Sequence, residues 1–177
     1  MRIVYRPIRK HELQQAYQLE SASYPAEAAA TLEAFHYRQE RFPDYFWSAW
    51  DEENGALAGI ANGIRTSALD CSDEEMKGAH QDDESGMRFC VLTVAVDASY
   101  QRLGIGRELM IRLIQTCRQE GLEAIILMCE QHLIAFYEQL GFAYRGESSS
   151  QHGGIKWHEL SLDLAWRQAA KAYNEPS

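Results

Sequence analysis

The chain of 177 residues has the length of a single domain, and its composition of 46% hydrophobic and 24% charged residues is that of an ordinary globular protein. A net charge of −9 argues against a nucleic-acid-binding surface, and no apolar run is long enough to cross a bilayer. The first residues lack the hydrophobic region of a secretory signal, which favours a cytoplasmic protein. The cysteines have no CxxC spacing and are expected to be reduced thiols: Cys71, Cys90, Cys117 and Cys129.

The first part of the chain predicts two helices among short strands. Alternating or aromatic-rich segments indicate strands, and apolar side chains at helical spacing indicate helices. Pro25 ends the first helical pattern, and Asn54-Gly55 is a hairpin signal between the second and third strands. Strands are therefore expected over residues 3–8, 45–50 and 57–64, and helices over residues 10–22 and 27–41.

The composition becomes strongly acidic between residues 70 and 84, where Lys77 is the one basic residue. A metal site made from these carboxylates and His80 would need a regular ligand spacing, which this stretch lacks. We therefore expect a solvated surface loop and no metal.

The centre of the chain predicts a strand, a glycine-containing turn and an amphipathic helix. Residues 91–96 form an apolar run rich in β-branched residues, and residues 97–100 read as a polar turn. After Gly104 and Gly106, apolar residues recur at helical spacing. The free N–H groups at such a helix start bind anions, and the glycines let a phosphate approach closely. Arg102 and Arg107 would add cationic hydrogen-bond donors. The start of this helix is therefore a predicted phosphate site.

The remaining segments complete a mixed sheet. Residues 123–129 predict another buried strand, residues 132–139 a helix, and Gly141-Phe142 the start of a further strand. Residues 155–164 alternate as a last strand, and the residues after 165 predict a short helix or a frayed tail. The alternation of strands and helices predicts an α+β fold with mixed strand directions.

The turn after the central strand resembles the pyrophosphate-binding motif of the GNAT acyltransferases, Q/R-x-x-G-x-G/A, here Gln101-x-x-Gly104-x-Gly106. The resemblance implies one GNAT domain over residues 1–165, with about seven mostly antiparallel strands, splayed between strands 4 and 5 and flanked by helices, and a tail over residues 166–177. It also implies acetyl-CoA as co-substrate. Its expected contacts are Val94, Ala95, Val96, Gln101, Arg102, Leu103, Gly104, Ile105, Gly106, Arg107 and Tyr137.

A second motif, Phe136-Tyr137-Glu138-x-x-Gly141-Phe142, is similar to the GNAT signature after the fifth strand. The resemblance implies that Tyr137 lies beside the thioester sulfur and protonates the departing thiolate. Together with the preceding LMCE sequence, the motif is closer still to the arylalkylamine (serotonin) N-acetyltransferase branch. The vertebrate members carry an H-x-H pair that is replaced here by Cys90 and Leu92, so this chain resembles non-vertebrate members.

The loss of that pair leaves open which group accepts the proton of the amine. Glu130 at the end of the fifth predicted strand is one candidate, although it could equally cap the following helix. His80, His132 and water on backbone carbonyls are the others.

The acceptor pocket implied by the resemblance has aromatic walls and a flexible thioether. Because neighbouring residues of a strand point to opposite faces, at most one of Phe46 and Trp47 can line it. The expected substrate contacts are Tyr24, Pro25, Phe46, Trp47, Val94 and Met128.

These features favour an acetyl-CoA-dependent enzyme that transfers acetyl directly to a small primary amine, an arylalkylamine or a polyamine, in a ternary complex. The alternatives are a GNAT that acetylates a protein N-terminus or lysine, and a non-catalytic acyl-CoA-binding module. The expected partner is a small-molecule amine, with no nucleic acid and no membrane, and the expected state is a monomer or weak homodimer.

Overall fold

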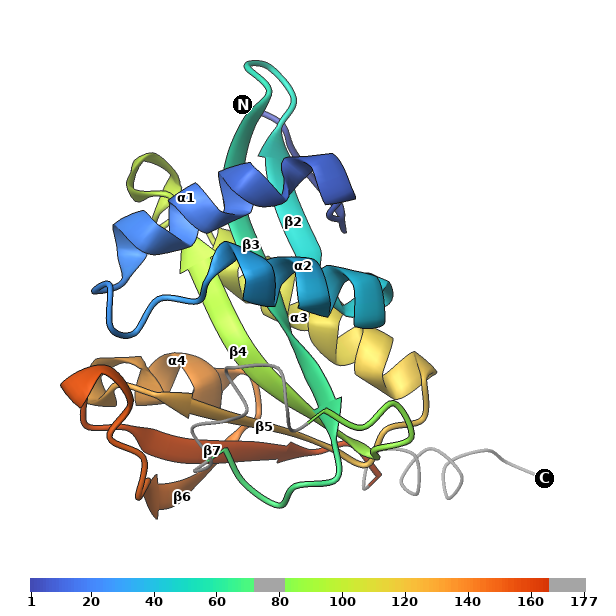
Figure 1. Cartoon of the computed structure of the whole chain (residues 1–177), viewed down its shortest axis with the longest axis vertical. Helices are drawn as coiled ribbons and strands as arrows, with labels where there is room; N and C mark the ends of the chain where they lie inside the picture. The colour runs from blue at the N-terminus through green and yellow to red at the C-terminus, as the bar shows by residue number, and fades with distance from the viewer. Residues whose placement is uncertain (72–81, 166–177) are drawn as a thin grey trace.

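The computed structural model describes residues 1–71 and 82–165, so most of the predicted acidic loop, His80 and the predicted tail lie outside the described residues. The described strands form one seven-stranded sheet in the order β1-β2-β3-β4-β5-β7-β6 (Figure 1). Neighbours are antiparallel except β4 and β5, which are parallel. The predicted mixed fold is confirmed. The strands are β1 (Ile3–Pro7), β2 (Trp47–Asp51), β3 (Ala56–Thr66), β4 (Arg88–Val96), β5 (Ala124–Cys129), β6 (Ala143–Glu147) and β7 (His158–Asp163).

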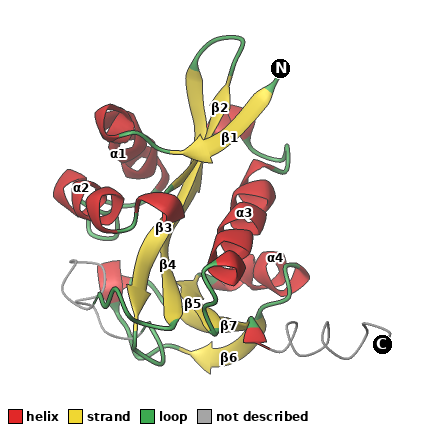
Figure 2. Cartoon of the chain, turned by 90° about the vertical axis from the view of Figure 1, so that its right-hand side faces the viewer, coloured by secondary structure: helices red, strands yellow, loops and turns green. Residues whose placement is uncertain are grey.

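Helices cover both faces of the sheet. α1 (Leu13–Ser23) and α2 (Leu32–Arg41) lie on one face, and α3 (Ile105–Gln119) and α4 (Ile134–Gln139) lie on the other (Figure 2). The amphipathic pattern of α3 explains its position, because six of its apolar side chains are buried. They are Ile105, Leu109, Met110, Leu113, Ile114 and Cys117.

The sheet opens between β4 and β5. The two strands pair only from Arg88 opposite Ala124 to Val91 opposite Leu127, and beyond Val91 they diverge (Figure 1). The register of β4 against β3 also shifts at this point, since Thr93 pairs with Asn62 but Val91 pairs with Gly63. Leu92 is therefore an extra residue in a β-bulge, which bends β4 away from β5. The predicted splay is confirmed.

The second helix begins later than the sequence pattern predicts. It was expected from residue 27 but starts at Leu32, where the Thr31 hydroxyl accepts a hydrogen bond from the Ala34 N–H at 3.1 Å. The preceding residues instead form a tight turn, in which the Ala28 and Ala29 N–H groups both donate to the Pro25 carbonyl. A threonine N-cap competes with helix continuation, so the strong helix formers before it remain in the loop.

Several other boundaries shift by one 3₁₀ turn. Short 3₁₀ segments occupy Lys10–Glu12, Pro43–Tyr45, Gln131–Leu133 and His152–Gly154. The aromatic strand consequently starts at Trp47 rather than residue 45. The last strand starts at His158 rather than residue 155, because residues 155–157 belong to no helix or strand.

All four cysteines are free and buried. Among residues 1–71 and 82–165, no helix is long and apolar enough to span a membrane. The same described residues contain no group of three or more His, Cys, Asp or Glu side chains suited to a metal ion.

Candidate active site

The predicted phosphate cradle lies at the N-terminus of α3. Gly104 is the N-cap residue with φ 79°, a left-handed conformation that favours glycine. A Cβ added at Gly104 would meet no protein atom within 4 Å, so the space in front of the helix is open. A Cβ at Gly106 would stand 3.5 Å from the Val96 side chain. The helix start and this open space fit a phosphate group.

A cleft of about 600 Å³ extends from this helix start along β4 to α4. Nine of the eleven residues expected to contact acetyl-CoA line it. Ala95 and Leu103 do not, because Ala95 is buried on the other face of β4 and Leu103 is 53% exposed. The nine are Val94, Val96, Gln101, Arg102, Gly104, Ile105, Gly106, Arg107 and Tyr137.

Replacing Gly104 by valine is expected to weaken acetyl-CoA binding about tenfold or more, because a branched side chain would fill the open space and strain the backbone. Gly121 is the matched control: it has φ 74°, and a Cβ there also meets nothing within 4 Å, but it lies beyond the far end of α3. Calorimetric titration with acetyl-CoA should separate the two variants. Equal affinity for both would contradict the phosphate-cradle assignment.

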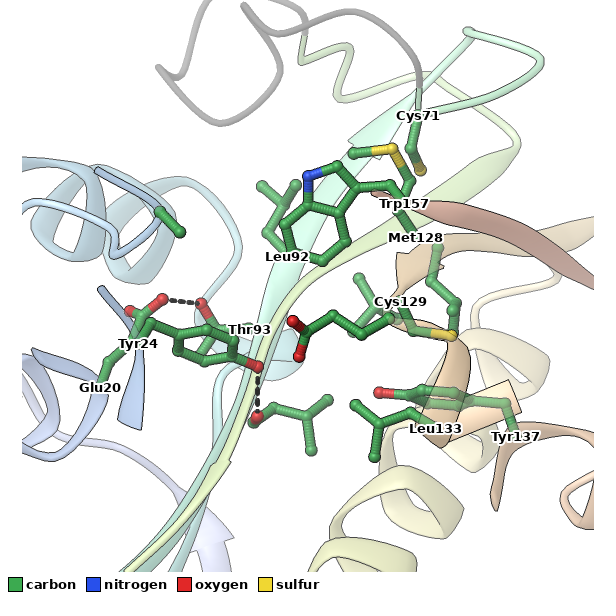
Figure 3. A pocket seen from close by; sticks show the side chains of 15 residues that line it. Glu20, Tyr24, Cys71, Leu92, Thr93, Met128, Cys129, Leu133, Tyr137 and Trp157 are labelled. Carbon is green, nitrogen blue, oxygen red and sulfur yellow. Dashed lines mark hydrogen bonds between the residues drawn. The ribbon is translucent and has the colours of Figure 1, made fainter. Parts of the chain in front are cut away.

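A second cavity lies in the opening between β4 and β5 (Figure 3). It is small, about 40 Å³, and has an apolar side formed by Leu92, Met128 and Trp157. Its polar side carries Glu20 and Thr93, and Tyr24 and Tyr137 also line it. The lining residues are Glu20, Tyr24, Ala28, Cys71, Val91, Leu92, Thr93, Val94, Leu127, Met128, Cys129, Glu130, Leu133, Tyr137 and Trp157.

Tyr137 belongs to both cavities. Val94, Leu133 and Tyr137 line the cleft as well as the smaller pocket, so the two spaces meet at these side chains. The Tyr137 ring is 6% exposed and is held edge-on between Phe136 and Phe142, with ring centroids 4.9 and 5.7 Å away. Burial raises the pKa of Tyr137 well above its usual value, so its phenol remains protonated at neutral pH.

Tyr24 faces the same space from the end of α1. Its hydroxyl donates a 3.1 Å hydrogen bond to the Val94 carbonyl, in the part of β4 that has no β5 partner. Burial raises the pKa of Tyr24 to about 12, and the nearby charges of Glu20 and Glu130 act in the same direction. Figure 3 shows the Tyr24 and Tyr137 side chains on opposite sides of the cavity.

Glu130 lies at the mouth of the pocket. It is the residue before the 3₁₀ turn Gln131–Leu133, but its side chain makes no capping hydrogen bond, so the capping interpretation is wrong. The carboxylate is 40% exposed, and its Oε2 lies 3.9 Å from His132 Nδ1. Glu130 is therefore free to face both the pocket and the solvent.

Three of the predicted acceptor contacts line this pocket, and three do not. Tyr24, Val94 and Met128 are present, whereas Pro25 is exposed in the α1–α2 loop. Phe46 is fully buried between the sheet and the first two helices, with its ring 5.4 Å from that of Phe35.

Trp47 also lies outside the pocket. It points to the other face of the sheet, where its Nε1 donates to the Thr116 hydroxyl of α3 at 3.1 Å. The assignment of Phe46 and Trp47 to the pocket is corrected, because β2 is two strands away from the opening.

Glu20, Thr93 and Trp157 also line the pocket, although the sequence did not predict them there. The spacing of Glu20 indicates that it is buried, because it follows Ala16 by four residues on the same face of α1, but it does not indicate the pocket. Trp157 reaches the pocket from the β6–β7 loop, where its Nε1 donates to the His152 carbonyl at 2.9 Å. No local pattern in the sequence indicates that contact.

A buried polar network supports the polar side of the pocket. The Arg38 guanidinium, 1% exposed, donates to Asn62 Oδ1 at 2.9 Å and to Thr93 Oγ1 at 3.2 Å. The Thr93 hydroxyl donates in turn to Glu20 Oε1 at 3.1 Å. Burial lowers the pKa of Arg38 to about 10, while the Glu20 charge opposes this change, so Arg38 is still charged at neutral pH.

A family model described as the acetyltransferase (GNAT) family matches residues 12–142, most of the chain and both motifs. The chain belongs to this GNAT acetyltransferase family. Serotonin N-acetyltransferase 2, chloroplastic, of Oryza sativa subsp. japonica is 43% identical over 53 residues, which cover 30% of this chain and 26% of the rice protein. The matches to the rice protein and to four other curated relatives span between 26% and 40% of the lengths of those proteins.

Solved structures share the GNAT fold along almost the whole chain. The loading GNATL domain of CurA from Lyngbya majuscula has a TM-score of 0.81 at 15% identity, covering 94% of this chain and 100% of that chain. The GphF GNAT-like decarboxylase in complex with isobutyryl-CoA has a TM-score of 0.75 at 20% identity, covering 93% and 100%. This GNAT family member therefore has a standard family fold, while its place in the arylalkylamine branch stays a prediction.

Proposed function

We propose that this GNAT family member is an acetyl-CoA-dependent N-acetyltransferase that acetylates a primary amine of a small molecule, an arylalkylamine or a polyamine, directly in a ternary complex. The observation that carries the proposal is the junction at Tyr137 of a long cleft and a small pocket. Direct transfer requires two substrates to meet at one point, and a proton donor must stand there for the leaving group.

The residues of the long cleft fit acetyl-CoA. Gly104 and Gly106 leave room at the start of α3 for the pyrophosphate, and Arg102 and Arg107 stand beside it. The β4 segment from Val94 to Val96 lacks a β5 partner, so it offers backbone groups to the pantetheine arm. When bound, acetyl-CoA supplies the activated acetyl group, and the chain positions it at Tyr137.

The covered pocket favours a small amine over a protein substrate. The α1–α2 loop touches the β6–β7 loop, since His152 Nε2 lies 3.2 Å from the Ala28 carbonyl oxygen. The two loops are closely packed, because a Cβ on Gly153 would lie 2.8 Å from that of Ala28. An extended peptide would need an open groove where these loops meet.

Acetyl transfer needs a donor for one proton and an acceptor for another, and the chain has a candidate for each. Tyr137, held in its protonated form by burial, would donate to the departing thiolate. The amine must lose a proton before or during its attack, and Glu130 at the solvent-accessible mouth is the candidate acceptor, with water as the alternative. His132 lies beside Glu130 and could pass the proton to solvent.

The pH dependence follows from the two phenols and the amine. Neither tyrosine should ionise at pH 6 to 10, because the pKa of Tyr24 is raised to about 12 and that of Tyr137 is raised further by burial. We therefore expect kcat/KM to rise with pH toward the pKa of the amine, about 10, without a fall from tyrosine ionisation. Thiol release from acetyl-CoA measures this for tryptamine, serotonin, phenethylamine, spermidine and an N-terminal peptide.

Each outcome of this panel has a distinct meaning. Turnover of small amines supports the proposal, and Glu130→Gln should then slow the reaction most at low pH, where the amine most needs a base. Turnover of the peptide alone would reassign the enzyme to protein acetylation. Binding of acetyl-CoA without turnover of any amine would favour a non-catalytic acyl-CoA-binding module.

A further inference from the structure

Glu20 is a buried carboxylate whose position calls for a functional explanation. It is 3% exposed, yet it lines the pocket, one helical turn before Tyr24. In Figure 3 the Glu20 carboxylate lies with Thr93 and Tyr24 on one side of the cavity, and Tyr137 lies on the other. Burying a carboxylate is costly unless opposite charge and hydrogen bonds compensate for the lost water.

The surrounding groups hold Glu20 in place and compensate for the burial of its carboxylate. Its Oε1 accepts hydrogen bonds from the Thr93 hydroxyl at 3.1 Å and from the Ala30 N–H at 3.2 Å. The buried Arg38 guanidinium supplies the opposite charge. Arg38 is not among the residues that line the pocket, whereas Glu20 and Thr93 are. The charged group that lines this side of the pocket is therefore the Glu20 carboxylate.

Glu20 and Glu130 are the two carboxylates among the described residues that line the pocket. Glu130 is 40% exposed at the mouth, where water screens its charge. Glu20 lies in the protein interior, where charges interact much more strongly than in water, although Arg38 offsets part of its charge. A primary alkylamine is a cation at neutral pH, so it would be drawn past the mouth toward the deeper carboxylate.

We infer that Glu20 binds the ammonium group of the acceptor amine and selects cationic acceptors over neutral molecules of the same shape. The inference rests on the proposed function and deepens it. The class of acceptor it implies has one cationic head directed at Glu20 and an apolar body beside Leu92, Met128 and Trp157. The amine loses its proton in a separate step, to Glu130 or to water, when its nitrogen moves from Glu20 toward Tyr137 on the opposite side of the cavity.

The test compares two competitive inhibitors of acetyl transfer to the best amine of the panel. One is the N,N-dimethyl analogue of that amine, which is cationic, and the other is the corresponding alcohol, which is neutral. The wild type should bind the cation more tightly, and Glu20→Gln should reduce the ratio of the two inhibition constants about tenfold. Glu33→Gln, an exposed carboxylate in the first turn of α2, should leave the ratio unchanged.

The ratio of the two inhibition constants distinguishes a role of Glu20 in binding the ligand from a role in stabilising the fold. Loss of a merely structural contact would weaken both inhibitors alike, so an unchanged ratio in Glu20→Gln would overturn the inference. If that variant does not fold, Glu20→Asp keeps the charge but withdraws it by one methylene, and the same comparison applies: a lower ratio supports the inference and an unchanged ratio overturns it. Failure of the wild type to acetylate any small amine would instead overturn the proposed function.

Discussion

Tyr137→Phe is expected to lower kcat by a factor of about 10² to 10⁴, the usual contribution of a general acid, while acetyl-CoA binds with unchanged affinity. The substitution removes only the hydroxyl, and the ring would keep its edge-on packing against Phe136 and Phe142. The phenol stands where the cleft and the pocket meet and is kept protonated by burial. Single-turnover kinetics at saturating acetyl-CoA, with calorimetry for binding, would measure both quantities.

Tyr144→Phe provides the control for this experiment. Tyr144 is 44% exposed on β6, and its hydroxyl bonds to His158 Nδ1 at 2.8 Å rather than facing either cavity. We expect its kcat to match the wild type. A Tyr137→Phe enzyme with kcat within two- or threefold of wild type would assign Tyr137 to packing, and the proton would then have to come from elsewhere.

Arg38→Met is expected to lower the free energy of unfolding by about 3 to 5 kcal/mol, the cost of removing one partner from a buried charged network. Methionine fills much of the same volume but cannot bond Asn62 or Thr93, and it leaves the Glu20 carboxylate without its opposite charge. Urea denaturation followed by fluorescence measures the change.

Two further variants test the cause of this loss. Arg41→Met changes the same residue type on the same helix, but Arg41 is 39% exposed and pairs with Asp82 and Glu84, so only a small effect is expected. The double variant Arg38→Met with Glu20→Gln should regain part of the stability, because it removes the stranded charge. Strictly additive losses would mean that the two groups do not interact.

The sequence could predict the helices and strands that are determined by the pattern of residues within the segment itself. The buried runs of β4 and β5, the apolar stripe of α3 and the glycines before it each carry their own pattern. Even the opening of the sheet follows from the family resemblance of those segments. The position of Tyr137 beside the cleft could be predicted for the same reason, since its motif is contiguous in the chain.

The acceptor side could be predicted less well, because it is assembled from distant segments. Glu20 on α1, Thr93 on β4 and Trp157 after β6 meet only through tertiary packing. Phe46 and Trp47 were wrongly assigned to the pocket. Aromatic residues in a short strand indicate that they line a core or a cavity, but the order of the strands decides which one they face. The missing H-x-H pair could be read from the sequence, whereas the buried Glu20 could not be placed in the pocket.

Where β4 diverges from β5, β4 has an open edge although it is a central strand of the sheet. An exposed edge is a site where other chains can add as strands and begin to aggregate, and proteins protect such edges. Here the half of β4 beyond Val91 has no partner on its β5 side and borders a cleft. The Tyr24 hydroxyl donates to the Val94 carbonyl in place of a neighbouring strand. Tyr24, at the end of the first helix, thus shields a strand edge whose backbone groups are still accessible from the cleft. The same stretch of β4 can therefore border a ligand cleft without offering an open edge to other chains.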